Sequence, residues 1–250
     1  MLVWKLLLTP VLIAAASLAG RRWGHAVSGW FVGLPLTSGP VALFLALERG
    51  TSFAADAALG ALAGAMAEAA FCLAYAYLAR GATWPAALAG ATIAFTLVAA
   101  ALQRAVTSWL IAALGAFVTL AIALSLMPRL RAMSAAAPPP RWDVPARMVI
   151  ATALVLAITE SAPVVGARVS GVLATFPVYA AILTVFAHRL GAASAVQVLR
   201  GLLWGLFGFV GFFVILGAAL EQTGIVFAFV LASGAALAIQ AMSFLAARPR

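Results

Sequence analysis

The acidic residue Glu68 is the first candidate for a functional site. It lies near the centre of the long apolar run "GALAGAMAEAAFCLAYAYL" (60–78). Placing a charged side chain at the centre of a bilayer costs at least about 2.5–3.5 kcal/mol on insertion scales, so we expect Glu68 to face the protein interior. Asp56, Gly60 and Gly64 precede it at intervals of four and share its helix face. A carboxylate in this position can bind a proton, a cation or a polar group of a substrate.

A second candidate site is the segment "GLPLTSGP" (33–40), which predicts a break in a membrane helix. Proline removes a helix hydrogen bond and clashes with the preceding turn, and freed backbone groups need protein or water to satisfy them. Two readings stay open: a discontinuous helix that lines a substrate cavity, and a packing kink whose hydroxyls bond back to their own helix. The candidate substrate contacts are Pro35, Thr37, Ser38 and Gly39, with Thr175, Pro177 and Tyr179 at similar depth in the second half of the chain.

Arg200 is the candidate cationic residue, because it lies about a turn and a half inside an apolar helix. It is either a countercharge for Glu68, a contact for an anionic substrate, or a side chain that snorkels to the surface. No arrangement of nucleophile and base can be argued, and Cys72 is the single cysteine, so no Cys/His cluster has zinc spacing. We therefore predict no enzymatic activity, no cofactor and no metal.

The composition indicates the elements that must hold these residues. Hydrophobic residues make up 66% of the 250 residues and charged residues 8%, whereas soluble domains carry about 25% charged residues. Apolar runs long enough to cross a bilayer recur along the chain, which predicts an all-α polytopic membrane protein. The net charge of +9 comes mostly from short loops between these runs. We interpret it as a determinant of orientation in the bilayer and predict no nucleic-acid partner.

The apolar runs predict about nine membrane helices, joined by short loops and one Pro-rich linker. The expected helices are 3–19, 25–47, 53–79, 84–102, 106–127, 147–164, 168–188, 194–219 and 223–246.

The motif G-x-x-V-S-G-x-x-x-x-x-P occurs twice, as "GHAVSGWFVGLP" (24–35) and "GARVSGVLATFP" (166–177). Further matches follow at a spacing of 141, including Gly60 with Gly201 and Gly64 with Gly205. The two copies lie five predicted helices apart. Because five is odd, the second copy must cross the membrane in the opposite direction, which predicts a 4+1+4 inverted-topology repeat. The expected parts are 1–102 (first four-helix repeat), 103–128 (adaptor helix), 129–146 (cytoplasmic Pro-rich linker) and 147–250 (second, inverted repeat).

The stretch "VSGVLATFPVYAAILTVFAHRLGAASAVQVLRGLLWG" (169–205) resembles the GlpM-type proteins, which are small four-helix inner-membrane proteins. The shared pattern is a glycine, a Phe-Pro pair, an apolar helix, a further glycine and a helix with Leu and Arg. The first half of the chain departs from it at Leu34 and Leu59. The resemblance implies a bacterial inner-membrane protein that arose by fusion of two such units, and it implies no substrate. The matching positions are Gly171, Phe176, Pro177, Gly191, Leu199 and Arg200.

These features favour a multi-pass inner-membrane transporter of an unidentified small polar or anionic solute, working by alternating access between the repeats. Proton coupling through Glu68 stays open, as does a homo-oligomer. Two alternatives also stay open: a flippase for a lipid or amphipath, and a non-transporting subunit of a membrane complex. The expected partners are the lipid bilayer and the solute or lipid.

The basic residues predict that the N-terminus is outside and the C-terminus is in the cytoplasm, because cytoplasmic loops carry the excess of Lys and Arg. A green fluorescent protein fused after Arg250 is expected to fluoresce, and an alkaline phosphatase fused there to be inactive. An active exported phosphatase would contradict this orientation. The outer side then carries Lys5, Arg49, Arg104 and Arg168, and the inner side carries Arg21, Arg22, Arg80, Arg129, Arg131, Arg141, Arg147, Arg189, Arg248 and Arg250.

Overall fold

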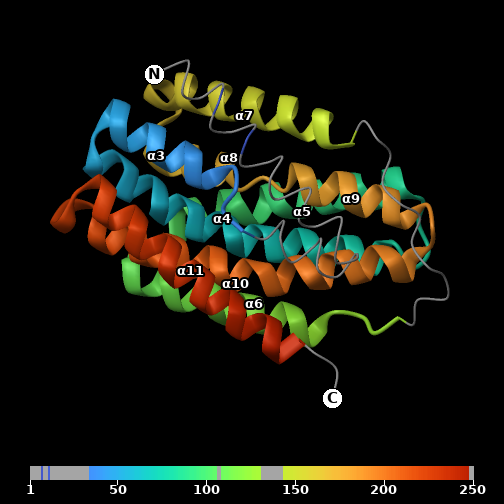
Figure 1. Ribbon diagram of the computed structural model, residues 1–250. Helices are drawn as coiled ribbons and strands as arrows, with labels where there is room; N and C mark the ends of the chain where they lie inside the picture. Colours follow the sequence, from blue (N-terminus) through green and yellow to red (C-terminus); the bar gives the residue numbers. More distant parts are fainter. Residues whose placement is uncertain (1–6, 8–10, 12–33, 106–107, 131–142, 248–250) are drawn as a thin grey trace.

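The structure is a computed structural model that describes residues 7, 11, 34–105, 108–130 and 143–247. Within these ranges the regular elements are all α-helices, and no strand occurs. Figure 1 shows the long helices packed side by side as one bundle. The helices are α3 (Ser38–Arg49), α4 (Thr51–Leu78), α5 (Trp84–Ala105), α6 (Trp109–Leu126), α7 (Asp143–Val165), α8 (Ala167–Ala174), α9 (Val178–His188), α10 (Ala192–Thr223) and α11 (Ile225–Ala247).

In the part of the chain that the structure describes, six helices are long and apolar enough to cross a membrane. The outward faces of α5, α6 and α11 carry large apolar side chains, such as Leu97, Leu110 and Val230, each more than half exposed. So large an apolar surface suits a bilayer and not water. The prediction of a helical membrane protein is therefore confirmed. The six candidate spans are Thr51–Leu78, Trp84–Gln103, Trp109–Leu126, Met148–Val165, Ala192–Thr223 and Ile225–Met242.

Most predicted helices lie where the apolar runs place them. The predicted helix 147–164 begins four residues earlier, at Asp143. Pro145 therefore lies in the first turn of α7 and not in the predicted linker 129–146. A proline is tolerated there because the first N–H groups of a helix have no partner within the helix. The predicted helix 3–19 lies outside the described residues, except for Leu7 and Val11, which are helical.

Two predicted helices are not continuous where the structure describes them. The prediction of one helix over 168–188 is wrong, because α8 ends at Ala174 and α9 begins at Val178. Proline fixes its own φ and disfavours the helical conformation of the residue before it, so Pro177 separates the two helices. In the predicted helix 25–47, α3 begins at Ser38 after a turn, and 25–33 lie outside the described residues.

Both interruptions contain the same turn, centred on Pro35 in the first half and on Pro177 in the second. In each turn the residue after the proline donates its N–H to the carbonyl of the residue before it, at 2.7 Å around Pro35 and 2.8 Å around Pro177. The residue four positions after each proline then donates to the proline carbonyl, at 2.8 Å in both turns. With φ −79° and ψ 56°, Pro177 has the geometry of an inverse γ-turn. We call these two segments the proline turns.

Helices α4 and α6 run in the same direction. Near the middle of both helices, the Met66 sulfur fills the space beside Gly115. Towards their C-terminal ends, the Tyr77 hydroxyl donates a hydrogen bond of 2.8 Å to the carbonyl of Leu126. Contacts at matching depths along both helices require parallel axes.

Helix α10 runs opposite to α6, and therefore opposite to α4. The ring of Trp109, at the start of α6, lies against Gly217 near the end of α10. At the other end of the bundle, Arg200 near the start of α10 donates a hydrogen bond of 2.9 Å to the carbonyl of Met127, just after α6. The central helices α4 and α10 are thus an antiparallel pair, and α6 packs against both.

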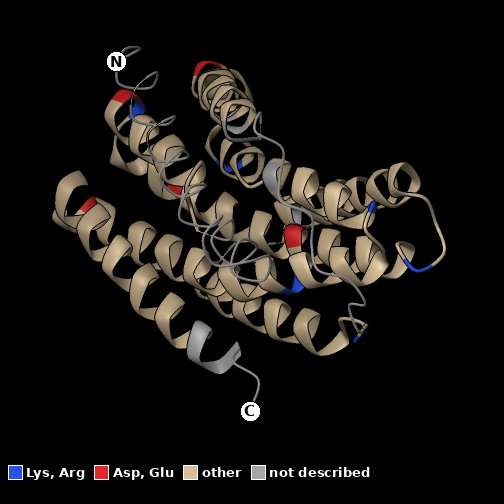
Figure 2. Cartoon of the chain, turned by 45° about the vertical axis from the view of Figure 1, so that its right-hand side comes forward, with Lys and Arg blue, Asp and Glu red and all other residues tan. Residues whose placement is uncertain are grey.

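Charged residues lie mainly at the two ends of the bundle, as Figure 2 shows. The end where α4 begins, which we call the Gly50 end, carries acidic residues of α3, α4, α7 and α10 near their termini, together with Arg49 and Arg168. The opposite end, which we call the His188 end, carries Arg80, Arg129 and Arg189. The two ends therefore differ in charge. The acidic residues at the Gly50 end are Glu48, Asp56, Glu160 and Glu221.

Glycines let α4 and α8 approach to backbone contact. A Cβ atom at Gly171 of α8 would overlap the carbonyl of Ala57 and lie 2.8 Å from the backbone nitrogen of Ala61. On α4, a Cβ at Gly60 would overlap the Arg168 carbonyl. The expectation that the glycines of α4 permit close helix approach is therefore confirmed.

We predict that Gly171→Ala lowers thermal stability in detergent, by roughly 1–3 kcal/mol in free energy of unfolding, because the added methyl meets backbone atoms that cannot move aside. Gly234→Ala is the matched control, since a Cβ on this helical glycine meets no atom within 4 Å. The control is expected to be neutral or slightly stabilising, because alanine is the better helix former. Equal melting temperatures for the two variants would contradict the close contact.

Candidate functional site

Glu68 is buried in the middle of α4, with 5% of its surface exposed. Helix α4 packs against α3, α5, α6, α8 and α10, so it is enclosed along most of its length. The expectation that Glu68 faces the protein interior is therefore confirmed.

No described residue forms an ion pair or a hydrogen bond with the Glu68 carboxylate. Its neighbours on α4 are small or apolar, and Cys72, one turn later, is fully buried as well. At the position that the predicted repeat pairs with Glu68, α10 carries Phe209. The carboxylate thus has no counterpart in the second half of the chain.

The second proline turn lies next to the face of α4 that carries Glu68. A Cβ at Gly64, one turn before Glu68 on that face, would overlap the Thr175 hydroxyl. Thr175 is buried and donates its hydroxyl to the Val172 carbonyl at 2.6 Å. The following Phe176 packs edge-on against Phe95 of α5, with ring centres 5.3 Å apart. The Thr175 hydroxyl therefore bonds to the helix that precedes it, as expected if the interruption is a packing kink and not a binding site.

Of the remaining candidates in this half, Pro177 is buried in the proline turn. The backbone of Tyr179 belongs to α9, and its side chain lies outside the described structure.

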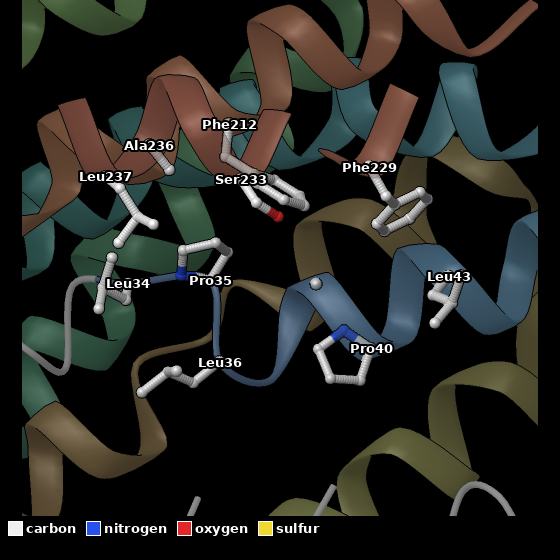
Figure 3. A pocket seen from close by; sticks show the side chains of 11 residues that line it. Leu34, Pro35, Leu36, Pro40, Leu43, Phe212, Phe229, Ser233, Ala236 and Leu237 are labelled. Carbon is white, nitrogen blue, oxygen red and sulfur yellow. The ribbon is translucent and has the colours of Figure 1, made fainter. Parts of the chain in front are cut away.

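The first proline turn lines a separate cavity of about 400 Å³ between α3, α10 and α11 (Figure 3). Pro35 and Gly39 contribute to its wall. Ser38 is buried at the start of α3, and Thr37 precedes that helix without a side-chain capping bond. Glu68 does not line this cavity. The structure therefore separates Glu68 and Thr175 from the candidates at the first proline turn.

Arg200 binds the end of α6 and not Glu68. Its guanidinium donates to the carbonyl of Met127 at 2.9 Å and to that of Pro128 at 3.4 Å. The last carbonyls of a helix have no partner within the helix, and a basic side chain satisfies them well. Arg200 thus holds α6 against α10. In the sequence, Pro128 directly after the apolar run 109–127 indicated a helix end whose carbonyls need such a partner.

A polar pair that the sequence did not single out closes the His188 end. Tyr75 is fully buried on α4, and its hydroxyl lies 3.1 Å from Nδ1 of His188, at the end of α9. The two rings meet edge-on with centres 5.7 Å apart. Tyr75 lies seven residues after Glu68, on the same helix face. The sequence could have indicated that Tyr75 needs a partner, because it lies on the buried face of Glu68 and a buried tyrosine requires a hydrogen bond.

Among the described residues, no group of three or more His, Cys, Asp and Glu side chains could hold a metal ion. A comparison with known protein families, curated proteins and solved structures finds no match to this chain.

We predict that Arg200→Gln lowers the free energy of unfolding by about 1.5–3 kcal/mol, the range for hydrogen bonds to charged groups, because two carbonyls lose their donor. Arg129→Gln is the control, since Arg129 is exposed at the same end of the bundle, and it is expected to melt like the wild type. Thermal unfolding in detergent measures both variants. An Arg200→Gln protein with wild-type stability would show that this capping interaction is dispensable.

Proposed function

We propose that the protein is a membrane transporter in which two inverted four-helix repeats alternate in exposing a site to either side of the bilayer. The helices of the two repeats begin at corresponding positions. Gly50 directly precedes α4 and Gly191 directly precedes α10, with φ values of 92° and 125° that favour glycine. These equivalent helix starts and the two proline turns support a duplicated unit.

The packing of the helices supports an inverted relation between the repeats. The central pair, α4 and α10, is antiparallel. Outside this pair, α3 contacts α11, and α9 contacts α5. A two-fold axis that exchanges the repeats replaces α3 by α9 and α11 by α5, so the two contacts are equivalent. Helix α6 touches both central helices, as the adaptor of a 4+1+4 arrangement would. In this proposal, α8 and α9 form one discontinuous membrane crossing, which brings the total to nine crossings.

The buried carboxylate of Glu68 is the observation that carries the transport function. An ionisable group in the membrane-spanning part of a helix is costly, and such residues mark substrate or ion pathways. Glu68 lies close to a helix interruption, and transporters with inverted repeats place their sites at discontinuous helices near the midplane. We assign Glu68 the binding of a proton, a cation or a cationic group of the solute.

In the proposed cycle, rocking of α3–α5 against α9–α11 opens the region around Glu68 alternately towards the Gly50 end and the His188 end. A group bound on one side is then released on the other. The proposed location is a bacterial-type inner membrane, with the His188 end in the cytoplasm. The basic residues at that end support this orientation. The resemblance to GlpM-type proteins fits an origin by fusion of two units.

A second candidate function is the translocation of a lipid or another amphipath. It is favoured by the apolar cavity at Pro35, which lies between helices of the two halves. A transported lipid would also require polar contacts for its headgroup along the path. Glu68 or Arg200 would have to provide these contacts.

We predict that Glu68→Gln leaves the protein folded and abolishes transport, because glutamine keeps the shape and removes the ionisable group. Solutes that raise the melting temperature of the wild type in detergent identify the substrate for uptake in proteoliposomes. The melting temperature of the variant without solute is expected to equal or exceed that of the wild type, since a buried carboxylate is costly. Glu221→Gln, a charge removal at an exposed helix end, is the control and is expected to transport normally. Full uptake by Glu68→Gln would overturn the assignment.

A further inference from the structure

The cavity at the first proline turn is almost entirely apolar. Its wall comes from the residues around Pro35, from Leu43 of α3, from Phe212 of α10, and from Phe229 and its neighbours on α11 (Figure 3). Among the described residues that line it, Ser233 alone has a polar side chain. Its volume of about 400 Å³ lies within the range of about 300–1,000 Å³ typical of ligand sites.

At the equivalent junction, where the second proline turn meets α5, two aromatic rings pack against each other. There Phe176, directly before Pro177, packs edge-on against Phe95 with ring centres 5.3 Å apart. The repeat pairs Phe176 with Leu34 and Phe95 with Ala236, and both of these smaller residues line the cavity. The cavity therefore lies where the first proline turn meets α11, whereas a ring pair fills the corresponding junction between the second proline turn and α5.

The cavity is continuous with the lipid-facing surface. Ser233 and Leu237 line it and are exposed on α11. The same helix presents Val226 and Val230 outward, with 79% and 63% of their surfaces exposed. In a bilayer, the molecules at such an opening are lipids, and the hydrocarbon part of a lipid matches an apolar wall.

We propose that this cavity binds one acyl chain of a bilayer phospholipid, which takes the place of the missing ring pair between α3, α10 and α11. The described wall has no charged side chain, so it suits the chain and not the headgroup, which stays at the bilayer surface. The proposal does not rest on the transport function, because a resident lipid is compatible with any role of Glu68.

The test uses the whole protein in vesicles of phosphatidylethanolamine and phosphatidylglycerol that contain a phospholipid with a diazirine in its acyl chain. After illumination, mass spectrometry maps the labelled residues. Wild-type protein is expected to be labelled strongly at Leu43 or Ser233. The double variant Leu34→Phe/Ala236→Phe copies the ring pair of Phe176 and Phe95 and is expected to lose this label. Val230→Phe, on the lipid-facing side of α11, is the matched control and is expected to keep it.

A second variant controls for the case in which the double variant fails to fold. Ser233→Trp adds a ring at the exposed mouth, away from the core, and it should also abolish labelling while leaving the melting temperature in detergent near that of the wild type.

Three results would overturn the proposal. The first is labelling of the cavity no stronger than that of Val230, which indicates annular lipid only. The second is unchanged labelling in both blocked variants. The third is a disulfide between Ser233→Cys and a cysteine placed within 12–33, together with absence of lipid label, which indicates that the chain's own N-terminal segment occupies the cavity.

Discussion

The backbone contact between α4 and α8 is the constraint on which the rest of the structure depends. Helix α8 has eight residues, too few to cross a bilayer. It is held where glycines remove the side chains that would separate it from α4, at Gly60, Gly64 and Gly171. Because α8 ends in a proline turn, this contact also places an interrupted helix against the face of α4 that carries Glu68.

The contact with α8 contributes to the enclosure of α4, which has a chemical consequence. With α8 on one side and α3, α5, α6 and α10 on the others, α4 leaves no lipid-facing position in the middle of its length. A carboxylate there keeps neither bulk water nor an ion-pair partner among the described residues. Such a group costs at least about 2.5–3.5 kcal/mol on insertion scales, and this cost is the reason for the proposal that Glu68 binds a proton, a cation or a cationic group.

The two halves share a scaffold and differ in what fills it. Both have the glycine that starts the long central helix and the turn centred on a proline. The first half carries the acid Glu68 where the second has Phe209. Leu34 and Ala236 line the junction between the first proline turn and α11, whereas the rings of Phe176 and Phe95 fill the junction between the second proline turn and α5. Equivalent helix starts and proline turns thus surround different side chains in the described parts of the two halves, with Glu68 near one turn and an apolar cavity at the other.

The sequence by itself determined the helical membrane class, the places of most long helices and the interior orientation of Glu68. These follow from length, composition and the cost of a buried charge, which act locally along the chain. It also marked Pro35 and Pro177 as equivalent. Only the tertiary structure decided that Arg200 binds the end of α6 and that Tyr75 meets His188. Each of these depends on which helix lies beside which, and contacts between residues far apart in sequence leave no periodic signal in either partner.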